Sequence, residues 1–193
     1  MDKEGEVIRQ IEDNIALKRY LQKEVTTLTT IAEQLVQAFR KGNKVLLFGN
    51  GGSAADAQHI ACELAGKFYR DRAPLPAIAL TTNTSALSAI ANDYGYNEVF
   101  ARQVRGLVKE GDMVIGISTS GNSLNVIRGI EEAKRHNAIT VAFTGQGGKL
   151  KDLADYALSI PSNNTPRIQE AHITAGHVVC YLVEEALFGD KDK

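Results

Sequence analysis

The chain has 193 residues, of which 44% are hydrophobic and 23% are charged, and its formal net charge is -1. This length and composition are typical of one domain with a sizeable core. The near-neutral charge argues against the basic patch of a nucleic-acid-binding protein, and no apolar run approaches the roughly 18 residues of a membrane span. The polar, acidic start of the chain is unlike a signal peptide, so we expect a cytoplasmic protein that binds neither nucleic acid nor membrane.

Residues 1–41 are expected to form two helices, or one bent helix, that ends at Gly42 as a C-terminal cap. Apolar residues recur there at helical spacing: Ile8, Ile11, Ile15, Val25, Leu28, Ile31, Leu35 and Phe39. The first part of this segment lies far from any expected strand. We therefore expect it to pack on another subunit in an oligomer.

From residue 44 onward, short apolar segments alternate with amphipathic ones. The apolar segments, expected to be strands, are 44–49, 76–80, 112–118, 139–145 and 156–161. The amphipathic segments, expected to be helices, are 53–68, 84–91, 97–108, 123–137 and 150–154, followed by a long helix over 167–187 that Pro166 opens and Gly189 closes. This alternation predicts a single α/β domain over 1–193, with a doubly wound parallel sheet covered by helices on both faces. Ligands of such sheets bind at the carboxyl ends of the strands.

The two cysteines, Cys62 and Cys180, are far apart in the sequence and form no C-x-x-C motif. A disulfide framework needs more cysteines than this in a chain of such length. We expect two buried thiols in a reducing compartment.

Two strand-to-helix turns are rich in glycine and hydroxyl residues: GNGGSAA at 49–55 and GISTSGNS at 116–123. Turns of this kind bring backbone N–H groups and a helix N-terminus together, which favours an anion. The first turn matches G-x-G-x-x-A, but the next strand ends in LTTNT without the acidic residue that a dinucleotide site needs. The second resembles a P-loop, but Asn122 stands where the lysine belongs. Tight turns without a ligand are the plain alternative, and a small phosphate monoester is the ligand that fits.

Several polar residues on the flanking helices are candidates for chemistry. His59 and Glu63 are four residues apart and share a helix face, as metal ligands, an acid/base pair or an ordinary side-chain pair. The last helix carries Gln169, Glu170, His172 and His177, of which Glu170 and His177 lie on one stripe, and each is equally compatible with a plain structural role. Asn92 and Asp93 are expected after a helix and before a turn, either as turn residues or to recognise sugar hydroxyls.

Four motifs occur together in this chain: GNGGSAADAQH, ANDYG, GISTSGNS and RIQEAHITAGH. In order and spacing they resemble the phosphoheptose isomerases, also called sedoheptulose 7-phosphate isomerases, of the SIS-domain superfamily, over nearly the whole chain. The resemblance implies a five-stranded, flavodoxin-like sheet and a cytoplasmic homotetramer with one zinc ion per subunit. It also implies conversion of sedoheptulose 7-phosphate to D-glycero-D-manno-heptopyranose 7-phosphate, for activated-heptose, lipopolysaccharide and capsule biosynthesis.

The resemblance also implies roles for individual residues. The catalytic pair matches Glu63 and His177, and zinc would be held by His59, Glu63, Gln169 and His177. The substrate would be lined by Asn50, Gly51, Gly52, Ser53, Asn92, Asp93, Ser118, Thr119, Ser120, Ser123 and Gln169. Two features depart from a simple transfer. Pro166 stands where some relatives carry an acid, and Gln169 and His177 would lie about 12 Å apart along a regular helix.

Aldose–ketose isomerisation moves a proton between C1 and C2 through an enediol, which needs a base and an acid. Glu63 is the expected base and His177 the expected acid, although Glu63 could instead, or in turn, ligate the metal. One alternative is a related SIS-domain scaffold that binds the bacterial replication initiator and lacks the residues matching Glu63 and His177. A second alternative is an isomerase for another sugar phosphate.

Overall fold

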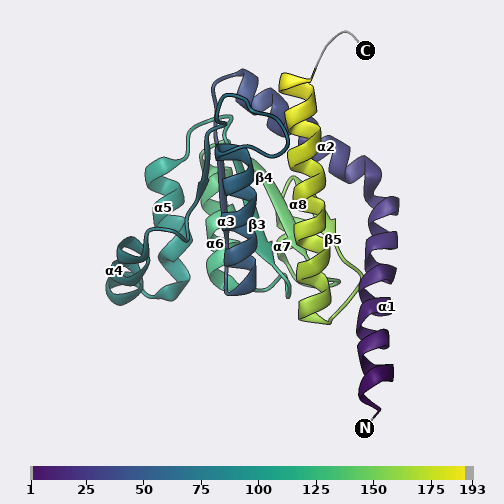
Figure 1. Ribbon diagram of the computed structural model, residues 1–193. Coiled ribbons are helices and arrows are strands. Elements are labelled where there is room, and N and C mark those ends of the chain that lie inside the picture. Colours follow the sequence, from purple (N-terminus) through teal and green to yellow (C-terminus); the bar gives the residue numbers. More distant parts are fainter. Residues whose placement is uncertain (1, 190–193) are drawn as a thin grey trace.

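The five apolar segments form one parallel sheet in the computed structural model, which describes residues 2–189 (Figure 1). The strand order is β2-β1-β3-β4-β5, the doubly wound, flavodoxin-like arrangement that the sequence predicts. The strands are β1 (Val45–Gly49), β2 (Ala77–Ala79), β3 (Met113–Ser118), β4 (Ile139–Thr144) and β5 (Tyr156–Ser159). β1 pairs with β3 from Val45 opposite Met113 to Gly49 opposite Ile117, so the two strands end side by side.

Helices cover both faces of the sheet because the strand side chains alternate between two apolar clusters. Val45 and Leu47 point into the cluster beneath α2 (Val25–Arg40), α3 (Gly52–Ala65) and α8 (Thr165–Phe188). Leu46 and Phe48 point into the cluster beneath α5 (Val99–Leu107), α6 (Leu124–Arg135) and α7 (Leu150–Leu153). The Phe48 ring stacks on that of Phe100 with centroids 4.8 Å apart.

The N-terminal segment is a bent pair of helices, as expected. α1 (Lys3–Leu21) and α2 are joined by a 3-10 turn over Gln22–Glu24, and Gly42 follows α2 in the left-handed region at φ 79°. α1 extends along α8 at one edge of the molecule, away from the sheet (Figure 1). It leaves Val7, Ile8, Ile11 and Ile15 exposed.

Some of the predicted helix boundaries are wrong. α3 ends at Ala65, before Gly66, so that Phe68 lies in the following loop. α4 (Thr84–Tyr94) continues past the predicted end at residue 91, and Asn92 and Asp93 therefore lie in its last turn rather than after it. A 3-10 turn over Tyr96–Glu98 then precedes α5.

Only one of the two cysteines is buried, which corrects the expectation of two buried thiols. Cys62 is exposed on the outer side of α3, whereas Cys180 is buried in α8. Burial raises the pKa of the Cys180 thiol to about 12, so that it stays protonated. Within residues 2–189, no helix combines the length and apolar character that crossing a membrane requires.

Candidate active site

The candidate site begins where the sheet changes direction. β1 has β2 on one side and β3 on the other, and the chain leaves β1 toward one face and β3 toward the opposite face. The loops after β1 and β3 therefore diverge and leave a crevice at the carboxyl ends of the strands. α3 starts at Gly52 and α6 at Leu124, so the positive ends of two helix dipoles lie at this crevice.

A cavity of about 270 Å³ occupies the crevice. Both glycine- and hydroxyl-rich loops line it, together with the first turn of α8: Asn50, Gly51, Gly52, Ser53, Ile117, Ser118, Thr119, Ser123, Thr165 and Gln169. The Ser118 hydroxyl lies 2.9 Å from that of Ser123 and 3.4 Å from that of Ser120. The structure thus brings the two predicted anion loops into one hydroxyl-lined cavity, and adds Thr165, which the sequence analysis missed.

An amide pair fixes one wall of the cavity. Asn50 Nδ2 donates to Asn125 Oδ1 at 2.9 Å, and Asn125 Nδ2 donates to Asn50 Oδ1 at 2.8 Å. The Tyr96 hydroxyl donates to the same Asn50 oxygen at 3.1 Å. Asn125 is buried on α6, a helix that the sequence analysis treated only as amphipathic. The sequence offered one indication of this role, because Asn125 is a polar residue on the side of that helix that faces the protein interior.

Two glycines border the cavity at the start of α3. Gly51 has a φ of 55°, in the left-handed region that side chains avoid. At Gly52, a Cβ atom would run into the side-chain amide of Gln169. Gln169 therefore lies directly over the start of α3, in the cavity.

A second cluster lies further along α3 and α8 and joins His59, Glu63 and His177. The Nε2 atoms of His59 and His177 are 2.8 Å apart, and His59 Nε2 is 3.4 Å from Glu63 Oε1. One donor atom from each of the three residues lies within 4.8 Å of the others. The structure thus brings together the predicted catalytic pair and three of the four predicted zinc ligands, from residues up to 118 positions apart in the sequence.

The chemistry of this cluster fits a metal ion. Two imidazole nitrogens and a carboxylate oxygen are the donors of many catalytic zinc sites, which leave a fourth position open. A tetrahedral ion with donors at about 2.0–2.2 Å separates neighbouring donor atoms by roughly 3.4 Å. The His59–Glu63 separation of 3.4 Å matches this value, whereas the 2.8 Å between the two histidine nitrogens is shorter and would lengthen around an ion. The structure thus supports a His–His–Glu site that could hold a metal.

Two further groups border the cluster and were missed by the sequence analysis. Asp56 lies one turn before His59, and burial raises its pKa to about 6 despite the opposing effect of His59. Its Oδ2 atom is buried and has no hydrogen-bond partner among residues 2–189. On the other side, the Phe68 ring packs against that of His177 with centroids 5.7 Å apart.

Five polar residues singled out in the sequence lie outside both the cavity lining and the cluster. Ser120 is the nearest, with its hydroxyl 3.4 Å from that of Ser118, which lines the cavity. Asn92 donates to Asp93 at 2.8 Å, and both are exposed at the end of α4. Glu170 pairs with Arg167 at 3.0 Å and accepts from Asn14 of α1, which makes it a tie between helices. His172 is fully buried beside the carbonyl of Thr144.

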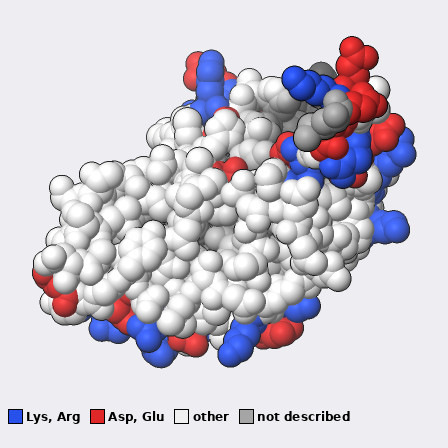
Figure 2. All heavy atoms as spheres, turned by 90° about the horizontal axis from the view of Figure 1, so that it is seen from below, with Lys and Arg blue, Asp and Glu red and all other residues white. Residues whose placement is uncertain are grey.

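The face on which α8 begins is largely free of charged side chains, which lie mainly along its edges (Figure 2). The residues that line the cavity are all uncharged. An anion bound there would therefore be held by hydroxyl and backbone N–H groups and by helix dipoles.

Comparisons with known proteins agree with this arrangement. The SIS domain family model matches residues 12–145. The phosphoheptose isomerase of Roseiflexus sp. (strain RS-1) is 56% identical over 184 residues, 94% of this chain and 93% of that protein. The phosphoheptose isomerase of Aquifex aeolicus is 59% identical over 159 residues, 82% of this chain and 83% of that protein.

Solved structures agree as well. The phosphoheptose isomerase of Neisseria gonorrhoeae superposes with a TM-score of 0.89 at 42% identity, covering 94% of this chain and 98% of that one. The enzyme of Francisella tularensis gives a TM-score of 0.92 at 34% identity, covering 96% and 100%. The chain belongs to the phosphoheptose isomerase family of SIS-domain proteins.

Proposed function

We propose that the chain is an aldose–ketose isomerase that converts sedoheptulose 7-phosphate to D-glycero-D-manno-heptopyranose 7-phosphate. The observation that carries this proposal is the His59–Glu63–His177 cluster beside a neutral, hydroxyl-lined cavity. We place the enzyme in the cytoplasm, at the start of activated-heptose synthesis for surface glycans such as lipopolysaccharide or capsule. The scaffold alternative is not favoured, because that relative lacks the residues matching Glu63 and His177.

The phosphate serves as a handle in this mechanism. Ser53, Ser118, Thr119, Ser120 and Ser123 supply hydroxyl groups, and the starts of α3 and α6 supply N–H groups. Because no phosphoryl group is transferred, the loop does not need the lysine that a P-loop carries at the position of Asn122. Holding the phosphate fixes the reacting end of the sugar at a set distance.

The distance from cavity to cluster fits a seven-carbon chain. His59 follows Gly52 by seven residues of α3 and His177 follows Gln169 by eight residues of α8, spans of about 10 and 12 Å along the helices. At about 1.2 Å per bond of an extended chain, C1 of a linear heptose 7-phosphate lies roughly 10 Å from its phosphorus. A pentose phosphate is shorter by about 2.4 Å on the same scale.

Glu63 and His177 perform the proton transfer. Glu63 takes the proton from the carbon next to the carbonyl. His177 donates a proton to the neighbouring oxygen as the enediol forms and takes a proton from oxygen as the enediol collapses. His59 and His177, with Glu63 and Gln169, would hold one zinc ion per subunit. When bound, such an ion supplies Lewis-acid stabilisation of negative charge on the substrate oxygens. Gln169 lies over Gly52 in the cavity, about 12 Å along α8 from His177. It therefore contacts the substrate in this proposal, and it would ligate an ion only at the cluster of another subunit.

Asn92 and Asp93 complete the proposed substrate contacts. They lie on α4, whose end leads through the 3-10 turn to Tyr96 and so to Asn50. We assign them to sugar hydroxyls at the open side of the cavity. A homotetramer through α1 is the proposed assembly.

The experiment is a product assay across sugar phosphates of five, six and seven carbons, with wild type and Glu63→Gln. We expect turnover of the seven-carbon substrate only, and loss of turnover in Glu63→Gln with unchanged circular dichroism. Turnover by Glu63→Gln within a few-fold of wild type would remove Glu63 as the base. Preference for a shorter sugar would replace the heptose with that substrate.

A further inference from the structure

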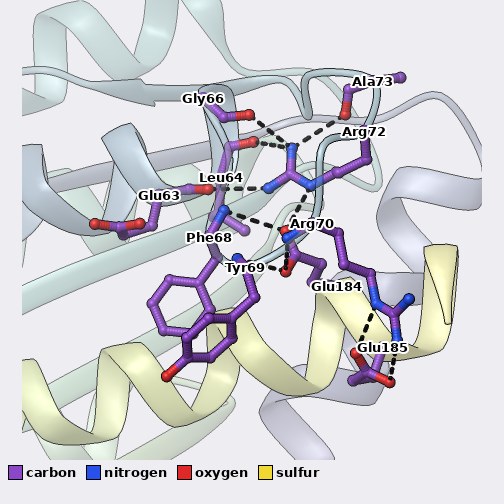
Figure 3. Close-up of polar contacts among 10 residues, drawn as sticks. All are labelled: Glu63, Leu64, Gly66, Phe68, Tyr69, Arg70, Arg72, Ala73, Glu184 and Glu185. Atoms are coloured by element: carbon purple, nitrogen blue, oxygen red, sulfur yellow. Dashed lines mark hydrogen bonds and ion pairs between the residues drawn. The ribbon is translucent and has the colours of Figure 1, made fainter.

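A buried ion pair lies behind the His59–Glu63–His177 cluster and has no part in the mechanism above. Arg72, in the loop after α3, pairs with Glu184 of α8 at 3.0 Å, and their side chains are only 3% and 1% exposed. Figure 3 shows that both side chains point into the space between this loop, the end of α3 and α8. Burying two charges costs free energy unless their hydrogen-bond partners are well placed. The role of the pair therefore depends on what each member contacts.

The Arg72 guanidinium caps the C-terminus of α3. Its Nη2 donates to the carbonyl of Glu63 at 2.9 Å, and its Nη1 donates to the carbonyls of Leu64 at 2.8 Å and Gly66 at 3.1 Å. The last carbonyls of a helix lack intrahelical donors and carry the negative end of its dipole. Arg72 therefore holds the backbone of Glu63 itself, in the turn where helices fray most readily.

Glu184 fixes the loop that covers His177. Its carboxylate accepts from the backbone N–H groups of Phe68 at 3.2 Å, Tyr69 at 2.8 Å and Arg70 at 3.0 Å. Burial alone would raise the pKa of Glu184, but these N–H groups and Arg72 lower it overall, so the group is anionic.

The loop held in this way forms the wall beside His177. The Phe68 ring lies 5.7 Å from the His177 ring and 4.5 Å from the Tyr69 ring, and Tyr69 in turn meets Tyr181 at 6.0 Å. Phe68, Tyr69, His177, Val178 and Tyr181 line a hollow of about 340 Å³. Glu184 follows His177 by two turns on the same helix.

We propose that the Arg72–Glu184 pair is the positioning device of the His59–Glu63–His177 cluster. Arg72 fixes Glu63 from the end of α3, Glu184 fixes the Phe68 wall of His177 from α8, and the ion pair joins the two. The pair thereby sets the distance between donor atoms carried by different helices. This inference rests on the proposed function only for its kinetic readout.

The test compares Glu184→Gln with Glu185→Gln. The first keeps the size and one carbonyl acceptor but removes the buried charge. The second breaks the Arg70–Glu185 pair, which joins the same loop and helix at 2.8 Å with side chains 35% and 37% exposed, and serves as the matched control. For each variant, kcat and KM for sedoheptulose 7-phosphate, Co²⁺ affinity from the visible absorption spectrum, and thermal unfolding are measured.

Glu184→Gln is expected to lower both kcat and Co²⁺ affinity by about 10–100-fold. Its KM should stay within about twofold of wild type. The contacts that bind the substrate equally in the ground state and the transition state lie in the cavity at the other end of α3, which this substitution does not touch. Glu185→Gln should match wild type in every measurement. A Glu184→Gln protein with a lowered Tm but the kcat and Co²⁺ affinity of Glu185→Gln would overturn the proposal and leave a purely structural pair.

A second variant serves if Glu184→Gln fails to fold. Arg72→Lys keeps the charge opposite Glu184 but loses the fork that reaches several carbonyls. It should fold and show a smaller loss of Co²⁺ affinity and kcat, whereas wild-type values for both would overturn the proposal. If wild type itself fails to isomerise the sugar phosphate, the proposed function fails, and the Co²⁺ comparison still decides the positioning role.

Discussion

The Nε2 atoms of His59 and His177 lie 2.8 Å apart although 118 positions separate the two residues in the sequence. At this distance the two ring nitrogens are within hydrogen-bond reach, and the tautomers decide which one donates. A cation between them would bind the lone pairs of both rings, with Glu63 as the third donor. The geometric basis of the metal proposal is therefore the convergence of these three donor atoms within 4.8 Å, with the two nitrogens moving apart to roughly 3.4 Å around an ion.

Removal of either imidazole should weaken metal binding. His59→Ala is the more informative variant, because His59 has no assigned role in proton transfer. We expect Co²⁺ affinity, measured by titration calorimetry, to fall at least about 100-fold, and a chelator to abolish wild-type turnover until Zn²⁺ is restored. His136→Ala, at the histidine that follows the end of α6 and pairs with Glu132, is the control. Unchanged Co²⁺ binding by His59→Ala would show that the cluster holds no metal.

Substitutions in the phosphate cavity should raise KM and leave kcat nearly unchanged. Ser123→Ala removes a hydroxyl that lies 2.9 Å from that of Ser118 and borders the cavity. A lost hydrogen bond to a charged group costs about 1.5–3 kcal/mol, which corresponds to a rise in KM of about 10–100-fold with kcat nearly unchanged. Steady-state kinetics measure both values. A fall in kcat at constant KM would place Ser123 in the chemical step instead.

The sequence predicts the fold well because its signals are local. Apolar segments alternate with amphipathic ones, and the two glycine-rich loops mark the carboxyl ends of β1 and β3, where the sheet changes direction. His59 and Glu63 share a helix face at a spacing of four residues. Family motifs supplied the remaining link, since no local pattern pairs His177 with residues of α3.

The features that the sequence analysis missed depend on tertiary packing. Asn125 became part of the site because a parallel sheet places the start of α6 opposite Asn50. Arg72 and Glu184 look like ordinary surface charges in the sequence, and their burial follows from how the loop after α3 folds against α8. The helical position of Asn92 and Asp93 was missed because α4 extends to Gly95, where the positive φ of 86° ends it.

The buried His172 should make stability depend on pH. Burial lowers its pKa from 6.5 to about 4, against the opposing effect of its hydrogen bond to Thr144. Between these values the unfolded chain binds a proton at His172 that the native chain does not, so His172 makes the free energy of unfolding rise with pH, opposite to the contribution of Asp56, whose pKa is raised to about 6. The contribution is complete above about pH 6.5 and is lost as the pH falls toward 4, an amount of up to about 3 kcal/mol.

Urea unfolding at a series of pH values tests this assignment. His172→Gln should make the free energy of unfolding rise less with pH between 4 and 6.5 than in wild type, because glutamine does not titrate there and Asp56, whose pKa is raised to about 6, still contributes a fall with pH. Equal slopes for His172→Gln and wild type would mean that another group causes the dependence.

The exposed apolar stripe of α1 is the expected contact surface of the proposed homotetramer. Ile8 and Ile11 are 57% and 55% exposed in the single chain, next to Val7 and Ile15. Apolar side chains clustered on one helix lose solvent contact when a second copy covers them, at about 25 cal/mol per Å² buried. The double variant Ile8→Glu/Ile11→Glu should therefore sediment as a smaller species, whereas Lys18→Glu on the same helix should not. If the double variant keeps the wild-type mass in analytical ultracentrifugation, the assembly uses a different surface.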